Sequence, residues 1–377
     1  MSKRSLGHRS LVALVLSAVT FTGVQGAAPA SAAPAPGGAP THSTVSRIEN
    51  EAARSIATSL TDPVLRSRIR TAALSFDEVD PAALAARTGT LTGKALGSRL
   101  RDADRRIAQA KGLDGTAGSL LRVRLGADSM REALSRGAEP LVVAASSDDD
   151  DATVTAYDAR GRAHTLDARR APGRPVYVVD IDESKAVSAG LEVLREAFRQ
   201  QNPSAPRLGA QQASAGWWAT KVDSVRLSDD KEPWVKGDAE VFSLVTGFGL
   251  DGKVRVDTVD MPYLNTDGTT YHPNQIVVNW STYKYNLADI VMMEDDGDTN
   301  YKALAQALTA ALLTIADQGT YIPLVNAVLD ALPESWWTDD PDYVESWYTL
   351  AQGSSGRLDG ASGNGWMSVS PYFVQEF

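Results

Sequence analysis

Apolar residues recur with a helical period through the first part of the chain. Between residues 45 and 60 they have the spacing of one helical face, at Val45, Ile48, Ala52, Ile56 and Leu60. Asp62-Pro63 and Asp80-Pro81 predict two further helix starts, because aspartate caps a helix and proline fits its first turn. The same pattern predicts helices over Ser98–Ala110, Asp128–Arg136 and Val187–Gln200.

Strand patterns interrupt these helices between residues 141 and 180. Val154–Tyr157 and His164–Leu166 flank the turn sequence Asp158–Gly161 and predict a β-hairpin. Pro175–Asp180 is another β-rich run. The first half is therefore expected to form a small helical α+β module with a modest core.

The second half alternates apolar and polar residues with a period of two. This pattern predicts strands over Trp218–Leu227, Asp238–Gly247, Lys253–Asp260, Gln275–Trp280, Asn286–Glu294 and Gly365–Val374. A helical pair interrupts them: the first helix runs from Tyr301 to Ile315, and the second begins at Pro323 and ends at Pro333. The predicted fold class is α+β, mainly β, with a C-terminal antiparallel β-sandwich that carries an inserted helical hairpin.

Composition divides the chain at the same place. All eight tryptophans and nine of the eleven tyrosines follow Gly216, and residues 217–377 carry 9 basic and 24 acidic side chains. Residues 202–216 are rich in Pro, Ala, Gly, Ser and Gln, as interdomain linkers are. The predicted organisation is a flexible leader over 33–43, an α+β domain over 44–201, the linker over 202–216, and an acidic, Trp-rich sandwich domain over 217–377.

The first 32 residues have the features of a secretory signal. Lys3, Arg4 and Arg9 precede the apolar run Leu11–Phe21, and Ala30-Ser31-Ala32 supplies a cleavage pattern. The run is too short to span a bilayer, which requires about 20 residues. We therefore expect a secreted, extracellular protein with no transmembrane anchor.

The composition also excludes several classes of function. The chain of 377 residues has no cysteine, which excludes disulfides, thiol nucleophiles and cysteine-ligated zinc. Its net charge of −10 argues against nucleic-acid binding, which relies on neutralising phosphates. No catalytic motif stands out, and His272 is the only histidine in the second half.

Acidic residues gather at one predicted end of the sandwich. If the first strands form an up-and-down meander, alternate loops meet at the same end, and the opposite end holds only Asp251. Carboxylates are the ligands that calcium prefers. The predicted calcium ligands are Asp230, Glu232, Glu240, Asp260, Glu294, Asp295 and Asp296.

Strand alternation strengthens this prediction. Glu240, Asp260 and Glu294 each share the apolar phase of their strand, where a carboxylate needs a compensating partner. A hairpin centred on residue 250 would place Glu240 directly opposite Asp260, and a cation would offset their repulsion. Two alternatives remain open: these acids are ordinary solvated loop residues, with a lysine such as Lys231 or Lys236 paired to Glu240, or they form a catalytic carboxylate pair.

Five segments of the second half have distinctive sequences: residues 229–240, 261–264, 271–275, 294–301 and 339–350, with Glu-Asp-Asp-Gly-Asp-Thr-Asn-Tyr at 294–301 as an example. Together they resemble a family of secreted bacterial proteins that is known only as a domain of unknown function. The resemblance covers most of 217–377 and implies no activity or catalytic residue. The acidic loops at one end of a sandwich are also similar in architecture to C2 domains.

The sequence thus favours a secreted, non-catalytic binding module with a calcium site at one end of its sandwich. Its partner would be a protein, a polysaccharide or a membrane surface. One alternative is a secreted hydrolase that uses a carboxylate pair on a glycan or peptide. Another is that the N-terminal region acts as a pro-segment or inhibitor of the C-terminal domain.

Overall fold

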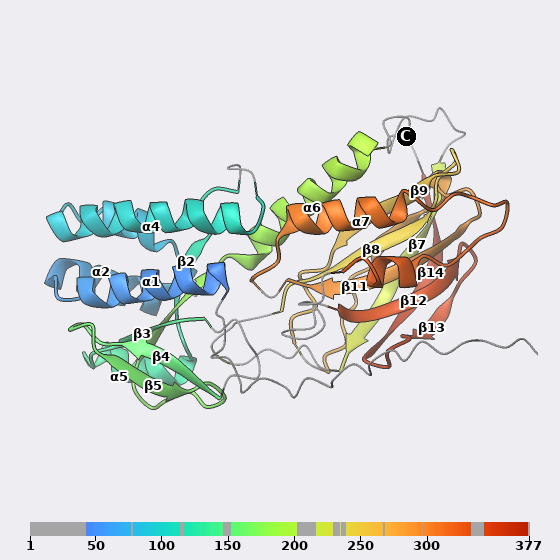
Figure 1. Cartoon of the computed structure of the whole chain (residues 1–377). Coiled ribbons are helices and arrows are strands. Elements are labelled where there is room, and N and C mark those ends of the chain that lie inside the picture. Colours follow the sequence, from blue (N-terminus) through green and yellow to red (C-terminus); the bar gives the residue numbers. More distant parts are fainter. Residues whose placement is uncertain are drawn as a thin grey trace, which may run out of the picture. The chain divides into compact units, whose positions relative to one another are not determined.

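A computed structural model describes ten segments of the chain (Figure 1): residues 43–76, 78–113, 117–145, 152–201, 216–228, 234, 239–266, 268–295, 297–332 and 343–375. All of them fall in one compact unit. The predicted signal segment 1–32, the predicted leader apart from Ser43, and the predicted linker apart from Gly216 lie outside the described residues.

The N-terminal half is a mixed sheet with helices on its faces. Its helices are α1 (Thr44–Ser59), α2 (Pro63–Ser75), α3 (Pro81–Ala86), α4 (Leu91–Ala110), a 3-10 turn (Asp128–Met130), α5 (Arg131–Ser135) and α6 (Glu183–Gln201). Its strands are β1 (Glu78–Val79), β2 (Leu121–Leu125), β3 (Leu141–Ala144), β4 (Thr153–Tyr157), β5 (Ala163–Asp167) and β6 (Val176–Ile181). They form one sheet, in the order β1-β2-β6-β3-β4-β5, in which only β3 and β6 run parallel.

Local signals in the sequence account for several of these elements. The Asp62 carboxylate accepts from the backbone N–H groups of Val64 and Leu65, and Asp80 accepts from Ala83. Each aspartate is followed by proline at the first helical position, as predicted. The hairpin around residues 158–161 is also confirmed as β4 and β5.

The C-terminal half contains two antiparallel four-stranded sheets. Its strands are β7 (Gly216–Leu227), β8 (Val241–Phe248), β9 (Val254–Asp260), β10 (Gln275–Asn279), β11 (Leu287–Glu294), β12 (Tyr343–Ala351), β13 (Gly356–Asp359) and β14 (Gly365–Gln375). A 3-10 turn (Trp280–Thr282) and the helices α7 (Tyr301–Leu312) and α8 (Val325–Leu329) complete it. The first sheet has the order β10-β7-β14-β13 and the second β12-β11-β8-β9; we call them sheet B and sheet C.

The predicted fold class is confirmed, but the predicted meander is wrong. β7 pairs with β10 and β14 in sheet B, whereas β8 pairs with β9 and β11 in sheet C. The chain therefore changes sheets between β7 and β8. The apolar side chains between the two sheets form one core, in which Val225 and Met367 of sheet B belong with Val245 and Ile290 of sheet C.

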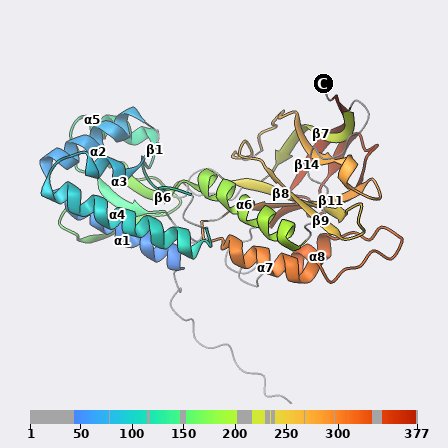
Figure 2. The ribbon, with the colours of Figure 1, turned by 90° about the horizontal axis from the view of Figure 1, so that it is seen from above.

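Sheet C is buried on both faces. On β8, Val241 and Val245 belong to the core between the sheets, while Phe242 and Leu244 belong to a second core under the helices. Three helices, α6, α7 and α8, supply that second core (Figure 2). Because α6 follows the last strand of the N-terminal sheet, residues from both halves build this layer.

Gly190 allows α6 and α7 to approach closely. A Cβ atom at this position would lie 2.3 Å from ring carbons of Tyr301 at the start of α7. Gly173 has no atom within 4 Å of such a Cβ. Gly190 is helical and Gly173 lies in a bend, so Gly173 serves as a control for the added methyl group where there is room for it.

We expect Gly190→Ala to lower the free energy of unfolding by about 1–3 kcal/mol, the usual cost of overpacking. A solvent-exposed helical Gly→Ala change would instead stabilise the chain by about 1 kcal/mol. Urea titration measures both variants, with Gly173→Ala expected to stay close to wild type. A gain in stability for Gly190→Ala would contradict this packing.

Candidate functional site

The predicted calcium ligands divide into two groups. Asp230, Glu232 and Asp296 lie outside the described residues. Four are described, and they lie at one end of sheet C: Glu240 before β8, Asp260 at the end of β9, and Glu294 and Asp295 at the end of β11. The acidic end inferred from the sequence therefore exists around these four residues.

The register of sheet C corrects the predicted geometry. Asp260 pairs with Phe242, so Glu240 lies diagonal to Asp260 and not directly opposite. Diagonal neighbours across an antiparallel pair are about 7–8 Å apart. Glu294 shares the strand phase of Ile290 and Met292, which face the core between the sheets, whereas Glu240 and Asp260 share the helix-facing phase.

Asp295 already has a cation beside it, from the other half of the chain. The Lys111 ammonium, at the end of α4, lies 2.9 Å from Oδ1 of Asp295 and donates to the carbonyl of Gly297 at 2.7 Å. The Tyr301 hydroxyl donates to Oδ2 of Asp295 at 2.8 Å. Both charged side chains are 0% exposed, so this is a fully desolvated ion pair.

Backbone contacts around this pair hold the two segments together. The Tyr301 N–H donates to the Lys111 carbonyl, and the Asn300 amide donates to the Ala110 carbonyl at 2.7 Å. Gly112 has a φ of +64°, and a Cβ there would lie 2.6 Å from the Asn300 side chain. Sequence analysis missed Lys111, because a lysine after a helix looks like a solvated C-terminal residue.

Trp234 makes a second contact with the N-terminal half. It follows Asp230 and Glu232 in the sequence, and its indole packs on Gly126 and Val178. A Cβ at Gly126 would lie 2.7 Å from this ring. The indole N–H donates to the Asp167 carbonyl at 3.3 Å, which places Trp234 on the face of the N-terminal sheet.

Asp180 is buried beside this contact. Its carboxylate lies 3.5 Å from the Arg124 guanidinium, whose N–H groups also lie 3.5 Å from the Trp234 carbonyl. Burial raises the pKa of Asp180 to about 6, although Arg124 opposes the rise. The folded chain thus holds this proton at a pH where the unfolded chain has released it.

Stability should therefore fall as the pH rises from about 4 to 6, by up to about 3 kcal/mol from this group alone. Asp180→Asn removes the titrating carboxyl group. The stability of this variant relative to wild type should therefore increase as the pH rises from about 4 to 6 and should stay constant above pH 6. Guanidinium unfolding between pH 4 and 7 measures this difference. Asp128→Asn, at a side chain that is 90% exposed, is the control. A difference between Asp180→Asn and wild type that does not change with pH would contradict the role of Asp180.

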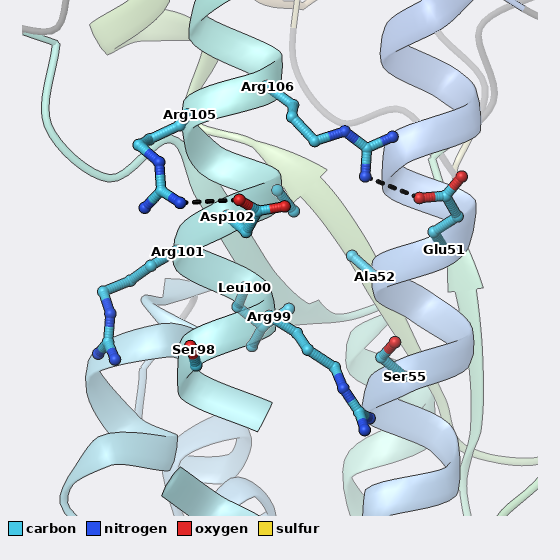
Figure 3. Close-up of a pocket in the computed structure, with 11 residues that line it drawn as sticks. Glu51, Ala52, Ser55, Ser98, Arg99, Leu100, Arg101, Asp102, Arg105 and Arg106 are labelled. Carbon is cyan, nitrogen blue, oxygen red and sulfur yellow. Dashed lines mark hydrogen bonds and ion pairs between the residues drawn. The ribbon is translucent and has the colours of Figure 1, made fainter. Parts of the chain in front are cut away.

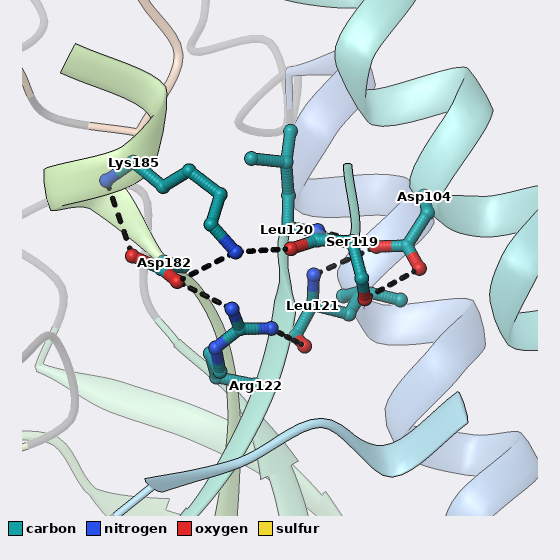
Figure 4. A network of polar contacts seen from close by, with 7 residues as sticks. All are labelled: Asp104, Ser119, Leu120, Leu121, Arg122, Asp182 and Lys185. Carbon is teal, nitrogen blue, oxygen red and sulfur yellow. Dashed lines mark hydrogen bonds and ion pairs between the residues drawn. The ribbon is translucent and has the colours of Figure 1, made fainter. Parts of the chain in front are cut away.

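A further polar network joins α4, β2 and α6 (Figure 4). Asp104 accepts from the N–H groups of Leu120 and Leu121 and from the Ser119 hydroxyl. Asp182, before α6, pairs with Arg122 of β2 and with Lys185. Each carboxylate therefore supports the start of a strand or a helix.

A charged groove of about 430 Å³ lies between α1 and α4 (Figure 3). Arg106 bridges to Glu51 across the groove at 2.9 Å, and Arg105 binds Asp102 within α4 at 2.7 Å. These side chains are largely exposed. Exposed pairs contribute about 0–1 kcal/mol each, so the groove has the properties of an ordinary charged helix surface.

A second groove, of about 700 Å³, lies by the β8–β9 turn and the end of α7. Its walls include the apolar Leu250 and Leu313 together with Lys253, Lys284 and Asp317. Asp317 is paired with Lys284 and accepts from the Tyr285 hydroxyl at 2.5 Å. These hydrogen bonds lower the pKa of Asp317 to about 2.

The outer face of sheet B has a different character. Along β14, Met367 and Val369 face the core, so the even-numbered residues face outward. With the polar residues they pair with on β7 and β13, they form a row of aromatic, hydroxyl and charged side chains, which we call the B face: Lys221, Ser224, Arg226, Arg357, Asp359, Trp366, Ser368, Ser370 and Tyr372. Arg357 is paired with Asp359 at 2.8 Å, and Lys221 with Asp223 at 3.0 Å.

Cations lie against the aromatic rings of the B face. The Arg357 guanidinium is 4.6 Å from the centre of the Trp366 ring, and the Lys221 ammonium is 5.6 Å from that of Tyr372. Tyr372 is 46% exposed. Sequence analysis did not identify this row, because the pairing of β7, β13 and β14 that assembles it is not local.

Metal ligands do not cluster in the part of the chain that the structure describes. No group of three or more histidine or acidic side chains is placed there to hold an ion. Within the same residues, no helix is long and apolar enough to cross a bilayer.

The fold and these surfaces define a class: a mixed α+β protein whose antiparallel sandwich has one sheet covered by helices and one open polar and aromatic face. The chain belongs to the family described as "Protein of unknown function (DUF3103)", whose model matches residues 50–377. The family resemblance inferred for 217–377 is thus confirmed and extends through most of the N-terminal half. No curated protein and no solved structure matches the chain.

Proposed function

We propose that this is an exported, non-catalytic binding protein whose B face binds a polysaccharide. The observation that carries the proposal is the row of aromatic, hydroxyl and charged side chains on β7, β13 and β14, in which Tyr372 is exposed and Trp366 is half-buried. Sheet C presents no equivalent row on its helix-covered side, because its outward apolar residues form a core with α6, α7 and α8.

The chemistry of the B face suits a sugar polymer. Flat aromatic rings with a polar surround offer stacking surfaces, and neighbouring Ser, Lys and Arg side chains offer hydrogen bonds to hydroxyl groups. Trp366 and Tyr372 are six residues apart on one strand, which at about 3.3 Å per residue separates them by about 20 Å. An extended polymer of several sugar units could contact both rings.

The hydrolase alternative requires a cleft that holds two carboxylates, one of which is protonated. In the second groove, Asp317 has a pKa of about 2 and a lysine partner, which does not suit a general acid. In the α1–α4 groove, Glu51 and Asp102 are each bound to an arginine. These features favour binding over hydrolysis.

We expect Trp366→Ala and Tyr372→Ala each to weaken polysaccharide binding at least about tenfold, since buried aromatic anchors commonly contribute 1.4 kcal/mol or more. Pull-down of the intact wild-type and variant chains on cell-wall sacculi, chitin and cellulose measures this loss of affinity. Tyr348→Ala is the matched control, because Tyr348 is an equally exposed tyrosine on β12 of sheet C. Retention by none of these polymers, or equal loss in all three variants, would refute the B face as the site.

Calcium binding at the acidic end is a second part of the proposal. It is supported by Glu240 and Asp260, which lie diagonal to each other on the same face of sheet C. Burial raises the pKa of Asp260, although the Ser188 hydroxyl at 3.5 Å and the charge of Arg195 oppose the rise. A bound cation would relieve that desolvation and would draw further ligands from the neighbouring acidic loops.

Calcium at a hundredfold excess over its Kd should stabilise the folded chain by about 2.7 kcal/mol and raise Tm by several degrees. The melt uses the intact mature chain, because α6 covers sheet C. Asp260→Asn should reduce the shift, and Asp330→Asn, at an exposed residue after α8, should leave it unchanged. An identical Tm in calcium and in excess chelator would refute the proposed calcium site.

A further inference from the structure

We propose that Lys111 and Asp295 condense into an amide bond, so that the mature protein carries a covalent crosslink between Nζ of Lys111 and Cγ of Asp295. The two residues are 184 positions apart in the sequence, and the pair is fully buried. The crosslink is independent of the binding function proposed above.

The geometry brings the reacting groups together and orients them. Nζ lies 2.9 Å from Oδ1 of Asp295, a hydrogen-bonding distance over which a proton can pass from the ammonium group to the carboxylate, and the carboxyl carbon is the next atom beyond that oxygen. The Gly297 carbonyl accepts from the same nitrogen at 2.7 Å, which limits the rotation of the ammonium group. The Tyr301 hydroxyl, 2.8 Å from Oδ2, approaches the carboxylate from its other oxygen.

The reaction balances with the atoms already present. Nζ first transfers one proton to Oδ1, which leaves a neutral amine beside a carboxylic acid. The amine attacks Cγ, and the charge that develops on Oδ2 is stabilised by the hydrogen bond from Tyr301. A second proton passes from nitrogen to Oδ1, the bond between Cγ and Oδ1 breaks, and one water molecule leaves.

Burial favours the product. The ion pair carries two desolvated charges, whereas the amide carries none, so condensation removes the desolvation cost of both groups. The reverse reaction needs a water molecule at a site where both side chains are 0% exposed. In the product, the amide N–H can still donate to the Gly297 carbonyl, and the amide C=O can still accept from the Tyr301 hydroxyl.

The crosslink would join the end of α4 to the loop between β11 and α7. These segments are already held by the backbone bond from Tyr301 to Lys111 and by the Asn300 contact with Ala110. A covalent bond there would keep these two segments next to each other even under conditions that unfold the surrounding structure. Such resistance is useful to an exported protein without disulfides.

Peptide mapping of the intact mature protein tests this inference. Trypsin should release residues 107–122 and 285–302 as one branched peptide, lighter than the sum of the two linear peptides by the mass of one water. Trypsin cannot cut at Lys111 once its ammonium group has become an amide. Fragment ions from both arms must appear together, because a cyclised Asp296-Gly297 pair would also lose one water, but within a single linear peptide.

Variants separate the chemistry from folding. Asp295→Asn should give the same branched peptide with loss of ammonia instead of water, and Lys111→Arg should give only linear peptides. Tyr301→Phe should slow the appearance of the branched peptide after synthesis, and an unchanged rate would overturn the role of the Tyr301 hydroxyl. Recovery of the three linear peptides 107–111, 112–122 and 285–302 from folded wild-type protein, with no branched peptide, would overturn the crosslink itself.

Discussion

The desolvated pair of Lys111 and Asp295 is the interaction on which the arrangement of the two halves depends. Two buried charges cost several kcal/mol each unless they are bound, and here both are bound: to each other, to the Gly297 carbonyl and to the Tyr301 hydroxyl. This requirement leaves little freedom in how the end of α4 meets the start of α7. It also means that one of the seven acids expected to hold calcium is already neutralised by a lysine.

The sandwich is asymmetric because, among the residues that the structure describes, helices cover only one of its sheets. α6, α7 and α8 bury the apolar side chains of sheet C that do not face sheet B, and α6 belongs in sequence to the N-terminal half. The N-terminal half therefore completes the core of the C-terminal half. Removing the N-terminal half, with α6, would expose Phe242 and Leu244. A pro-segment that detached from the C-terminal half would therefore leave apolar side chains in contact with water. No described helix packs on the B face.

Local patterns predicted most elements but not all. Alternation located β7, β8, β9, β10, β11 and β14, and helical periodicity located α1, α4, α6 and α7. β12 escaped because Glu345 interrupts its apolar pattern; the carboxylate is buried and accepts from the N–H groups of Ser346, Ser362 and Gly365. The helix predicted from Pro323 is only the short α8, Val325–Leu329. A buried carboxylate bound by backbone N–H groups cannot be distinguished from a solvated one by residue type.

The sequence by itself determined what depends on neighbouring residues: the elements, the Asp-Pro helix starts, the division of composition near residue 216, and the family. Tertiary structure decided what depends on residues far apart in the chain. The strand pairings place Asp260 opposite Phe242, where the sequence had predicted Glu240, and they assemble the B face from three strands. The packing of the end of α4 against the residues after β11 places Lys111 beside Asp295. The physical reason is that side-chain period and capping are local properties of the backbone, whereas pairing register and the partner of a buried charge are set by the packing of the whole core.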